Sequence, residues 1–159
     1  MSDQLDEMYR DVILDHYRSP RGKKDIARED IISAGHNPSC GDELDLSLEV
    51  DSGKVKDIHV DCRGCAISTA SGSILAEIVK GKTLAEAKQI AGIVKSILKG
   101  EETEIPDNLG DVDALQGVRQ FPVRIKCALL AWVTLLEGIE SFENGKSKPS
   151  GSVSTEEKE

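Results

Sequence analysis

The sequence has few aromatic residues and no long apolar run. Its 159 residues include one Trp, two Tyr and two Phe. Few side chains are therefore available to stack on bases or on large aromatic cofactors. No apolar run approaches the roughly 18 residues that span a bilayer, and the first residues carry neither a basic flank nor an apolar stretch for secretion. We therefore expect a cytoplasmic protein without a membrane partner.

Positive charge is also scarce. The chain has 20 Lys and Arg against 29 Asp and Glu, a net charge of -9, which repels polyphosphates, so nucleic acid is not an expected partner. Leu, Ile, Val and Phe make up about a quarter of the chain, above the ~20% level at which charged chains stay disordered. The length suits a single domain, which we place at residues 1–142. Residues 143–159 hold one apolar side chain, Val153, and are predicted to be a disordered tail.

Periodic apolar residues predict four helices separated by Gly, Pro and polar residues. A capping-box start at Thr83 to Glu86 marks the third of them, and Pro122 fits the first position of the last. The predicted helices cover residues 3–17, 66–75, 83–100 and 122–142. Between the last two, the acidic stretch from Glu101 to Asp113 is predicted to be a solvated loop.

A β-hairpin is predicted in the first half of the chain. Apolar and polar residues alternate strictly from Leu44 to Val50, and again around Ile58 and Val60, which is typical of half-buried strands. The turn-rich segment 36–42 precedes this hairpin and holds the first of the four cysteines.

Four cysteines allow two disulfides, a metal site, a redox pair or core packing. In a reducing compartment disulfides are rare, and thiols tend to serve metals or chemistry. Cysteine is also among the most buried residue types, so each thiol has to be weighed separately against a role as a small core residue.

Cys40 is followed by Gly41 and Asp42. Residues two apart in a straight strand lie ~6.6 Å apart, whereas two donors on one zinc ion must lie within ~4 Å. The chain must therefore curl between them, and Gly41 permits the curl at little steric cost. The pattern is a plausible thiolate and carboxylate chelate; an ordinary turn, with Asp42 bonded to the backbone, is the alternative.

Cys62 and Cys65 have the two-residue spacing of zinc and redox motifs, but strand parity separates them. If the alternation continues, Cys62 points to the same apolar side as Ile58 and Val60 and serves as a core residue. Cys65 lies at the start of the small-residue helix, where unpaired N–H groups and the helix dipole stabilise a thiolate. Cys65 is the better ligand or nucleophile of the two.

Cys127 lies in a predicted helix rich in apolar residues, where a lone cysteine is more often part of the packing. Arg124 and Lys126 stand beside it, and cations there would favour a thiolate and offset an anionic metal site. Of the three histidines, His36 is a candidate hydrogen-bond donor to the ligands, while His16 and His59 are expected to be solvated.

The motifs Cys40-Gly41-Asp42, Gly64-Cys65-Ala66-Ile67-Ser68 and Pro122-Val123-Arg124-Ile125-Lys126-Cys127 resemble the IscU/NifU-N family of iron–sulfur cluster assembly proteins, and most closely its SufU branch. The resemblance implies an α+β fold in which a small antiparallel β-sheet packs against several α-helices, with the three motifs meeting at one exposed end. It also implies four metal ligands: Cys40, Asp42, Cys65 and Cys127.

Two departures separate this sequence from the scaffold branch of that family. Lys126 stands where the scaffold branch has a histidine, and residues 120–124 replace its chaperone-binding segment Leu-Pro-Pro-Val-Lys. The connection from Cys65 to Cys127 is also longer than in the scaffold branch, as in SufU-like proteins. These features favour a protein that carries sulfur over one that builds clusters.

The resemblance therefore implies a zinc-dependent sulfurtransferase. It would accept persulfide sulfur from a pyridoxal-phosphate (PLP)-dependent cysteine desulfurase and pass it to a downstream iron–sulfur scaffold or apoprotein. Cys40 is the predicted sulfur acceptor, because its glycine-flanked loop can leave a fully ligated zinc ion at less cost than a helix-borne cysteine; Arg124 would offset negative charge. Two alternatives stay open: a scaffold that binds a transient iron–sulfur cluster at the same residues, and an interaction domain in which zinc only holds loops together.

Overall fold

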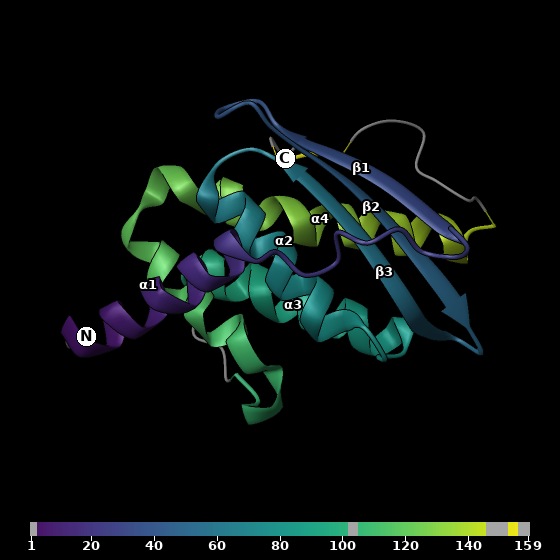
Figure 1. The fold of residues 1–159 in the computed structure, drawn as a ribbon, viewed down its shortest axis with the longest axis horizontal. Coiled ribbons are helices and arrows are strands. Elements are labelled where there is room, and N and C mark those ends of the chain that lie inside the picture. Colours follow the sequence, from purple (N-terminus) through teal and green to yellow (C-terminus); the bar gives the residue numbers. More distant parts are fainter. Residues whose placement is uncertain (1–2, 102–104, 146–152, 156–159) are drawn as a thin grey trace.

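The structure, a computed structural model, describes residues 3–101, 105–145 and 153–155 (Figure 1). Its helices and strands run in the order α1 (Asp3–Arg18), β1 (Ile31–Asn37), β2 (Asp42–Asp51), β3 (Lys54–Arg63), α2 (Ala66–Val79), α3 (Leu84–Leu98), η1 (Asp107–Gln120), η2 (Pro122–Arg124), α4 (Ile125–Glu143) and β4 (Val153–Ser154), where η marks a 3₁₀ helix. Among these described residues, no helix is both long and apolar enough to cross a membrane.

The strands form one sheet in the order β3-β2-β1-β4. The predicted hairpin is confirmed: β2 and β3 pair antiparallel, and the alternating leucines Leu44, Leu46 and Leu48 are buried. The predicted α+β class is also correct, but the sheet is mixed, because β4 pairs parallel to β1. The sequence predicted no strand pairing for β1, which pairs antiparallel with β2 along all seven of its residues.

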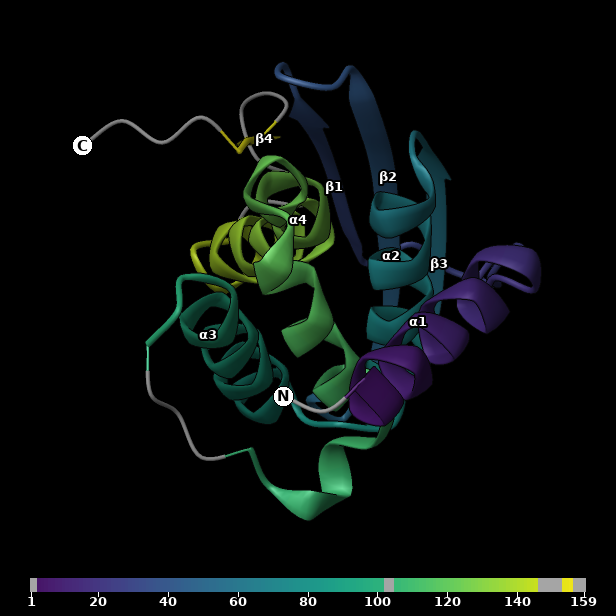
Figure 2. The same cartoon turned by 90° about the vertical axis from the view of Figure 1, so that its left-hand side faces the viewer.

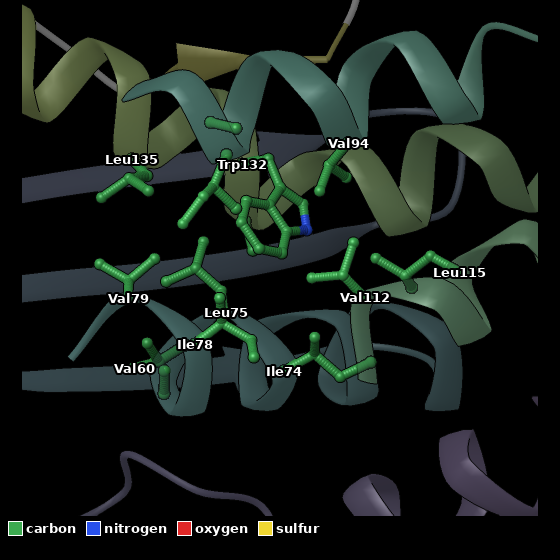
Figure 3. Close-up of a cluster of buried hydrophobic side chains, with 14 of the residues drawn as sticks. Val60, Ile74, Leu75, Ile78, Val79, Val94, Val112, Leu115, Trp132 and Leu135 are labelled. Carbon is green, nitrogen blue, oxygen red and sulfur yellow. The ribbon is translucent and has the colours of Figure 1, made fainter. Parts of the chain in front are cut away.

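The helices cover one face of the sheet (Figure 2). Helices α2 and α4 pack against the strands and against each other, while α1 lies on α2 and α3 lies on α4. Trp132 of α4 is fully buried at the centre of a cluster to which β3, α2, α3, η1 and α4 all contribute (Figure 3). Its indole N–H donates to Ser71 Oγ at 2.9 Å, so the largest core side chain leaves no unpaired polar atom.

The acidic connection after α3 differs from the prediction of a solvated loop. Residues 102–104 lie outside the described part of the chain, but η1 begins at Asp107 and buries Leu109, Val112 and Leu115. Gly110 breaks the helix between Leu109 and Val112 (φ 54°, ψ -125°). After this break Val112 and Leu115 are three positions apart, which places them on one side of a 3₁₀ helix. The prediction of a loop rested on the number of acidic residues and overlooked the spacing of the apolar ones.

His16 was expected to be solvated, and the structure contradicts this. The side chain is fully buried, with Nδ1 2.7 Å from Ser73 Oγ and Nε2 2.7 Å from Asp111 Oδ2. Ligand atoms of His16, Glu77 and Asp111 lie within 4.8 Å of one another, but Glu77 is already paired with Arg21 at 3.2 Å. We interpret the group as a polar link that joins α1, α2 and η1.

The chain after residue 142 was predicted to be disordered. Helix α4 ends at Glu143, residues 146–152 and 156–159 lie outside the described residues, and Val153–Ser154 forms β4. For this short part the prediction is wrong. The backbone groups at the edge of β1 offer pairing partners that composition does not reveal.

Candidate metal and thiol site

Three segments that are far apart in the sequence meet at one end of the molecule: the β1–β2 turn, the end of β3, and the start of α4 (Figure 1). The β1–β2 turn and the start of α4 bring together ligand atoms of Cys40, Asp42 and Cys127, all within 4.8 Å of one another. Cys40 is exposed, whereas Asp42 and Cys127 are buried. An exposed thiol therefore stands over a buried thiol and carboxylate.

The Cys40 turn has the curl that the Cys-Gly-Asp spacing requires. Gly41 adopts a φ of 75°, a left-handed conformation that favours glycine. The backbone N–H groups of Cys40 and Gly41 donate to the carbonyl of Asn37, at 3.3 and 2.8 Å. This turn brings the side chains of residues 40 and 42 to the same side.

Asp42 connects the turn to helix α2. Its Oδ1 accepts the backbone N–H of Cys65 at 2.9 Å, and its Oδ2 accepts the side-chain N–H of Asn37 at 3.2 Å. The carboxylate thus has a fixed orientation before any ion binds, which lowers the entropy cost of binding one.

Cys65 is the N-cap residue of α2, as its position at the helix start predicted. Its sulfur accepts the backbone N–H of Ser68 at 3.4 Å, one of the unpaired donors of the first helical turn. The sulfur does not belong to the group formed by Cys40, Asp42 and Cys127. It lies close enough to Cys127 to influence the pKa of that thiol.

Cys62 lies opposite Leu44 in the β2–β3 ladder and packs against the hydrophobic core. The parity argument therefore predicted its side correctly. Burial raises the pKa of the Cys62 thiol, and within the described residues Cys62 is in neither group of potential metal ligands. It behaves as a core thiol.

Cys127 is buried in the first turn of α4, among other acceptors. Burial raises the pKa of its thiol, and so do Asp42, Cys40 and Cys65, because a second anion next to them is unfavourable without a compensating cation. The exposed Arg124 supplies part of that compensation: its hydrogen bond to Cys127, together with the charges of Cys65 and Cys40, raises the pKa of the guanidinium.

Asn37, which the sequence did not single out, donates hydrogen bonds to two of the proposed ligands. Its side-chain N–H groups point at Asp42 Oδ2, 3.2 Å away, and at Cys127 Sγ, 3.5 Å away. His36, the predicted donor, is half-buried in β1. The signal for Asn37 was its place directly before Pro38 at the start of a turn, where Asn side chains often bond to the backbone.

These donors suit zinc. Sulfur and carboxylate oxygen are among its usual protein ligands, and closed structural sites have four. Cys40, Asp42 and Cys127 are already assembled, and Cys65 lies beside them. Hydrogen bonds from Asn37 to two of these residues resemble the outer contacts that orient metal ligands.

Replacing Cys62 by alanine is expected to leave metal binding unchanged, since Cys62 lies outside the assembled group. The loss of packing should lower stability by about 1 kcal/mol. Metal content and thermal melting of the purified variant measure both effects. Cys65→Ala is the matched comparison, because it removes a thiol three residues away and should weaken binding; equal metal loss in both variants would contradict the separation of the two thiols.

Gly64→Ala is expected to weaken the site without altering a ligand. A Cβ at this position would overlap Asp42 Oδ1 and lie 2.8 Å from Ser68 Oγ, so the buried carboxylate must move. We expect metal affinity to fall about 10- to 100-fold, the usual effect of disturbing an outer contact, as measured by competition with a chelator. Gly92→Ala, whose Cβ meets nothing within 4 Å, is the control and should retain wild-type affinity.

Fold and site together define a class of protein: a small α+β domain that presents thiols and a carboxylate from three separate segments at one end. The NifU-like N-terminal domain family matches residues 8–148. The chain belongs to this family, and the membership predicted from its cysteine motifs is confirmed.

Two relatives cover nearly the whole chain but bear different functional names. One is the zinc-dependent sulfurtransferase SufU of Bacillus subtilis, 40% identical over 89% of this chain and 95% of its own. The other is the iron–sulfur cluster assembly scaffold protein IscU of Streptococcus pyogenes, 36% identical over 90% of this chain and 89% of its own. The first fits the SufU branch to which the motifs pointed.

A solved structure supports the fold. FiSufU from Fervidobacterium islandicum AW-1, described as a candidate iron–sulfur cluster assembly scaffold protein for the SUF system, superimposes with a TM-score of 0.75 at 32% identity. The match covers 80% of this chain and 93% of FiSufU. The predicted IscU/SufU-like α+β fold is therefore confirmed.

Proposed function

We propose that this protein is a zinc-dependent sulfurtransferase of iron–sulfur cluster assembly. It would accept persulfide sulfur from a PLP-dependent cysteine desulfurase and pass it to a scaffold or apoprotein. The zinc-dependent sulfurtransferase name of the 40% identical SufU supports this choice. An exposed working thiol also suits the reducing cytoplasm, where we expect the protein to act.

The difference in exposure between the thiols carries the proposal. Cys40 is exposed, Cys65 is half-buried, and Cys127 is fully buried. A cysteine persulfide on another protein can reach only a thiol that projects from the surface. A Cβ on Gly41, next to Cys40, would meet no atom within 4 Å, so the turn has open space in which to move towards a donor.

The reaction is a thiol–persulfide exchange. The Cys40 thiolate attacks the terminal sulfur of the donor persulfide, forming a new S–S bond on Cys40 while the S–S bond of the donor breaks. The donor cysteine leaves as a thiolate and takes up a proton. Sulfur is transferred without any net oxidation, so no further oxidant or reductant is needed.

The other site residues hold the arrangement in place. Bound zinc would keep the thiols deprotonated without redox chemistry of its own. Asp42 fixes the turn to α2 through its bond to the Cys65 N–H. Cys127 and Cys65 would remain as ligands on the rigid helices, and the Arg124 guanidinium would offset the negative charge of three thiolates and a carboxylate.

A cluster scaffold is the second candidate. The 36% identical relative from Streptococcus pyogenes is named a scaffold, and thiolates are the usual ligands of iron–sulfur clusters. Three cysteines and Asp42 could hold such a cluster in the same position.

Purification without air distinguishes the two candidates. A colourless protein with bound zinc, whose intact mass rises by one sulfur after incubation with a cysteine desulfurase and cysteine, supports the sulfurtransferase. A brown protein with bound iron and sulfide, and no persulfide after the same incubation, would support the scaffold instead. If zinc is needed for folding but the protein never gains sulfur, the result would support the interaction domain instead.

A further inference from the structure

The short strand β4 ends next to the metal and thiol site. Gly35 and His36 of β1 pair with Val153 and Ser154, and the Thr155 N–H donates to the His36 carbonyl at 3.1 Å. We call residues 153–155 the C-terminal strap. Its last residue, Thr155, is buried, and its hydroxyl donates to Asn37 Oδ1 at 3.0 Å.

Asn37 uses its full hydrogen-bonding capacity. On one side Oδ1 accepts the Thr155 hydroxyl and the Ser39 N–H, 3.3 Å away. On the other side Nδ2 donates to Asp42 Oδ2 and to Cys127 Sγ. A side-chain amide has two donors and two acceptor sites, so every one of them is paired.

This pairing fixes which way the amide faces. A flipped Asn37 would place its oxygen against the Asp42 carboxylate and its NH₂ group against the Ser39 N–H, and both contacts are repulsive. The Ser39 N–H and the Asp42 carboxylate set this orientation, because a hydroxyl can pair with either end of an amide. The Thr155 hydroxyl adds a second bond at Oδ1, which holds the amide in place. Because the amide is buried, an unmet bond costs more than it would in water.

We propose that Thr155 is a positioning residue of the metal site. Through Asn37 it orients two hydrogen bonds onto Asp42 and Cys127, so the C-terminal strap is part of the site and not a passive end of the chain. The strap lies beyond residues 8–148, the part matched by the family. The inference rests on the proposed metal ligands Asp42 and Cys127.

The test compares Thr155→Val with Thr155→Ser in the full-length protein. Valine keeps the shape and loses the hydroxyl, whereas serine keeps the hydroxyl. We expect zinc transfer to a chromophoric chelator to be about 3- to 10-fold faster in the valine variant, the effect of losing a typical hydrogen bond. The serine variant should release zinc at the wild-type rate, and so should the control Ser52→Ala, which alters an exposed hydroxyl in the β2–β3 turn.

A second readout is the thiolate-to-cobalt absorption of the protein loaded with Co²⁺. The band should shift in the valine variant and keep its wild-type position in the serine variant. A loss of stability alone would not move this band. Unchanged zinc release and an unchanged band in Thr155→Val would overturn the inference, while the proposed metal ligands would stand. A wild-type protein that takes up neither metal would overturn the ligand assignment, and with it the inference.

Discussion

Cys40→Ala is expected to reduce sulfur acceptance from a cysteine desulfurase by at least about 100-fold, because it removes the nucleophile. The exposed position of Cys40 means that the variant should fold normally. Metal affinity should also fall, since one ligand is lost, but Asp42, Cys65 and Cys127 remain. Sulfur acceptance is measured as desulfurase turnover in the presence of each variant, with cysteine as the substrate.

Cys62→Ala is the matched control for that experiment, because it removes one thiol from the same end of the molecule. It should support turnover at close to the wild-type rate. A Cys40→Ala protein that supports normal turnover would contradict the assignment of Cys40 as the sulfur acceptor, whatever its metal content. Equal loss of turnover in both variants would show instead that any missing thiol perturbs the site.

Asp42→Ala is expected to lower metal affinity more than about 100-fold, beyond the effect of disturbing an outer contact. It removes a proposed ligand and also the acceptor of the Cys65 N–H and of Asn37. Leaving such donors unpaired in a buried place typically costs about 1–3 kcal/mol, so the metal-free variant should also melt at a lower temperature than the metal-free wild type.

Asp42→Asn separates the two effects of that change. The amide oxygen can still accept the Cys65 N–H, but the negative charge is lost. Its NH₂ group would face the Asn37 N–H, which Asp42 Oδ2 accepts in the wild type. We therefore expect the metal-free protein to melt below the wild type but above Asp42→Ala, with weakened zinc binding in chelator competition. Wild-type zinc affinity in both variants would remove Asp42 from the ligand set.

The parts of the fold that follow local rules could be predicted from the sequence. The leucines of β2 alternate with polar residues, and that period determines which face of the strand is buried. Thr83 and Glu86 form the predicted capping box at the start of α3. The same parity argument placed Cys62 on the core side of β3, and only because the ladder stays in register from Ile58 to Cys62.

Features that depend on distant contacts could not be predicted. His16 was expected to be solvated, yet it is buried with Ser73 and Asp111, which lie far along the chain. Thr155 lies in a segment of low apolar content. Its burial depends on the pairing of the C-terminal strap with the edge of β1. Local composition carries no information about such pairings.

The sequence predicted the candidate ligands of the site but not the hydrogen bonds that support them. The Cys-Gly-Asp spacing indicated a chelate before the turn was known, because only a curled chain brings both donors to one ion. The hydrogen bonds of Asn37 were not visible, since they require β1, β2 and α4 to meet. The position of Cys65 at the start of α2 was predicted, and the structure identifies the Ser68 N–H as the donor to its sulfur.

Peptide mapping of the persulfide tests the proposed function most directly. The zinc-loaded wild-type protein is incubated with a cysteine desulfurase and cysteine, alkylated, digested, and analysed by mass spectrometry. We expect the added sulfur on the peptide that contains Cys40, with Cys62, Cys65 and Cys127 recovered without it. Persulfide on Cys65 or Cys127 with none on Cys40, or no persulfide on any peptide, would contradict the assignment of Cys40 as the sulfur acceptor.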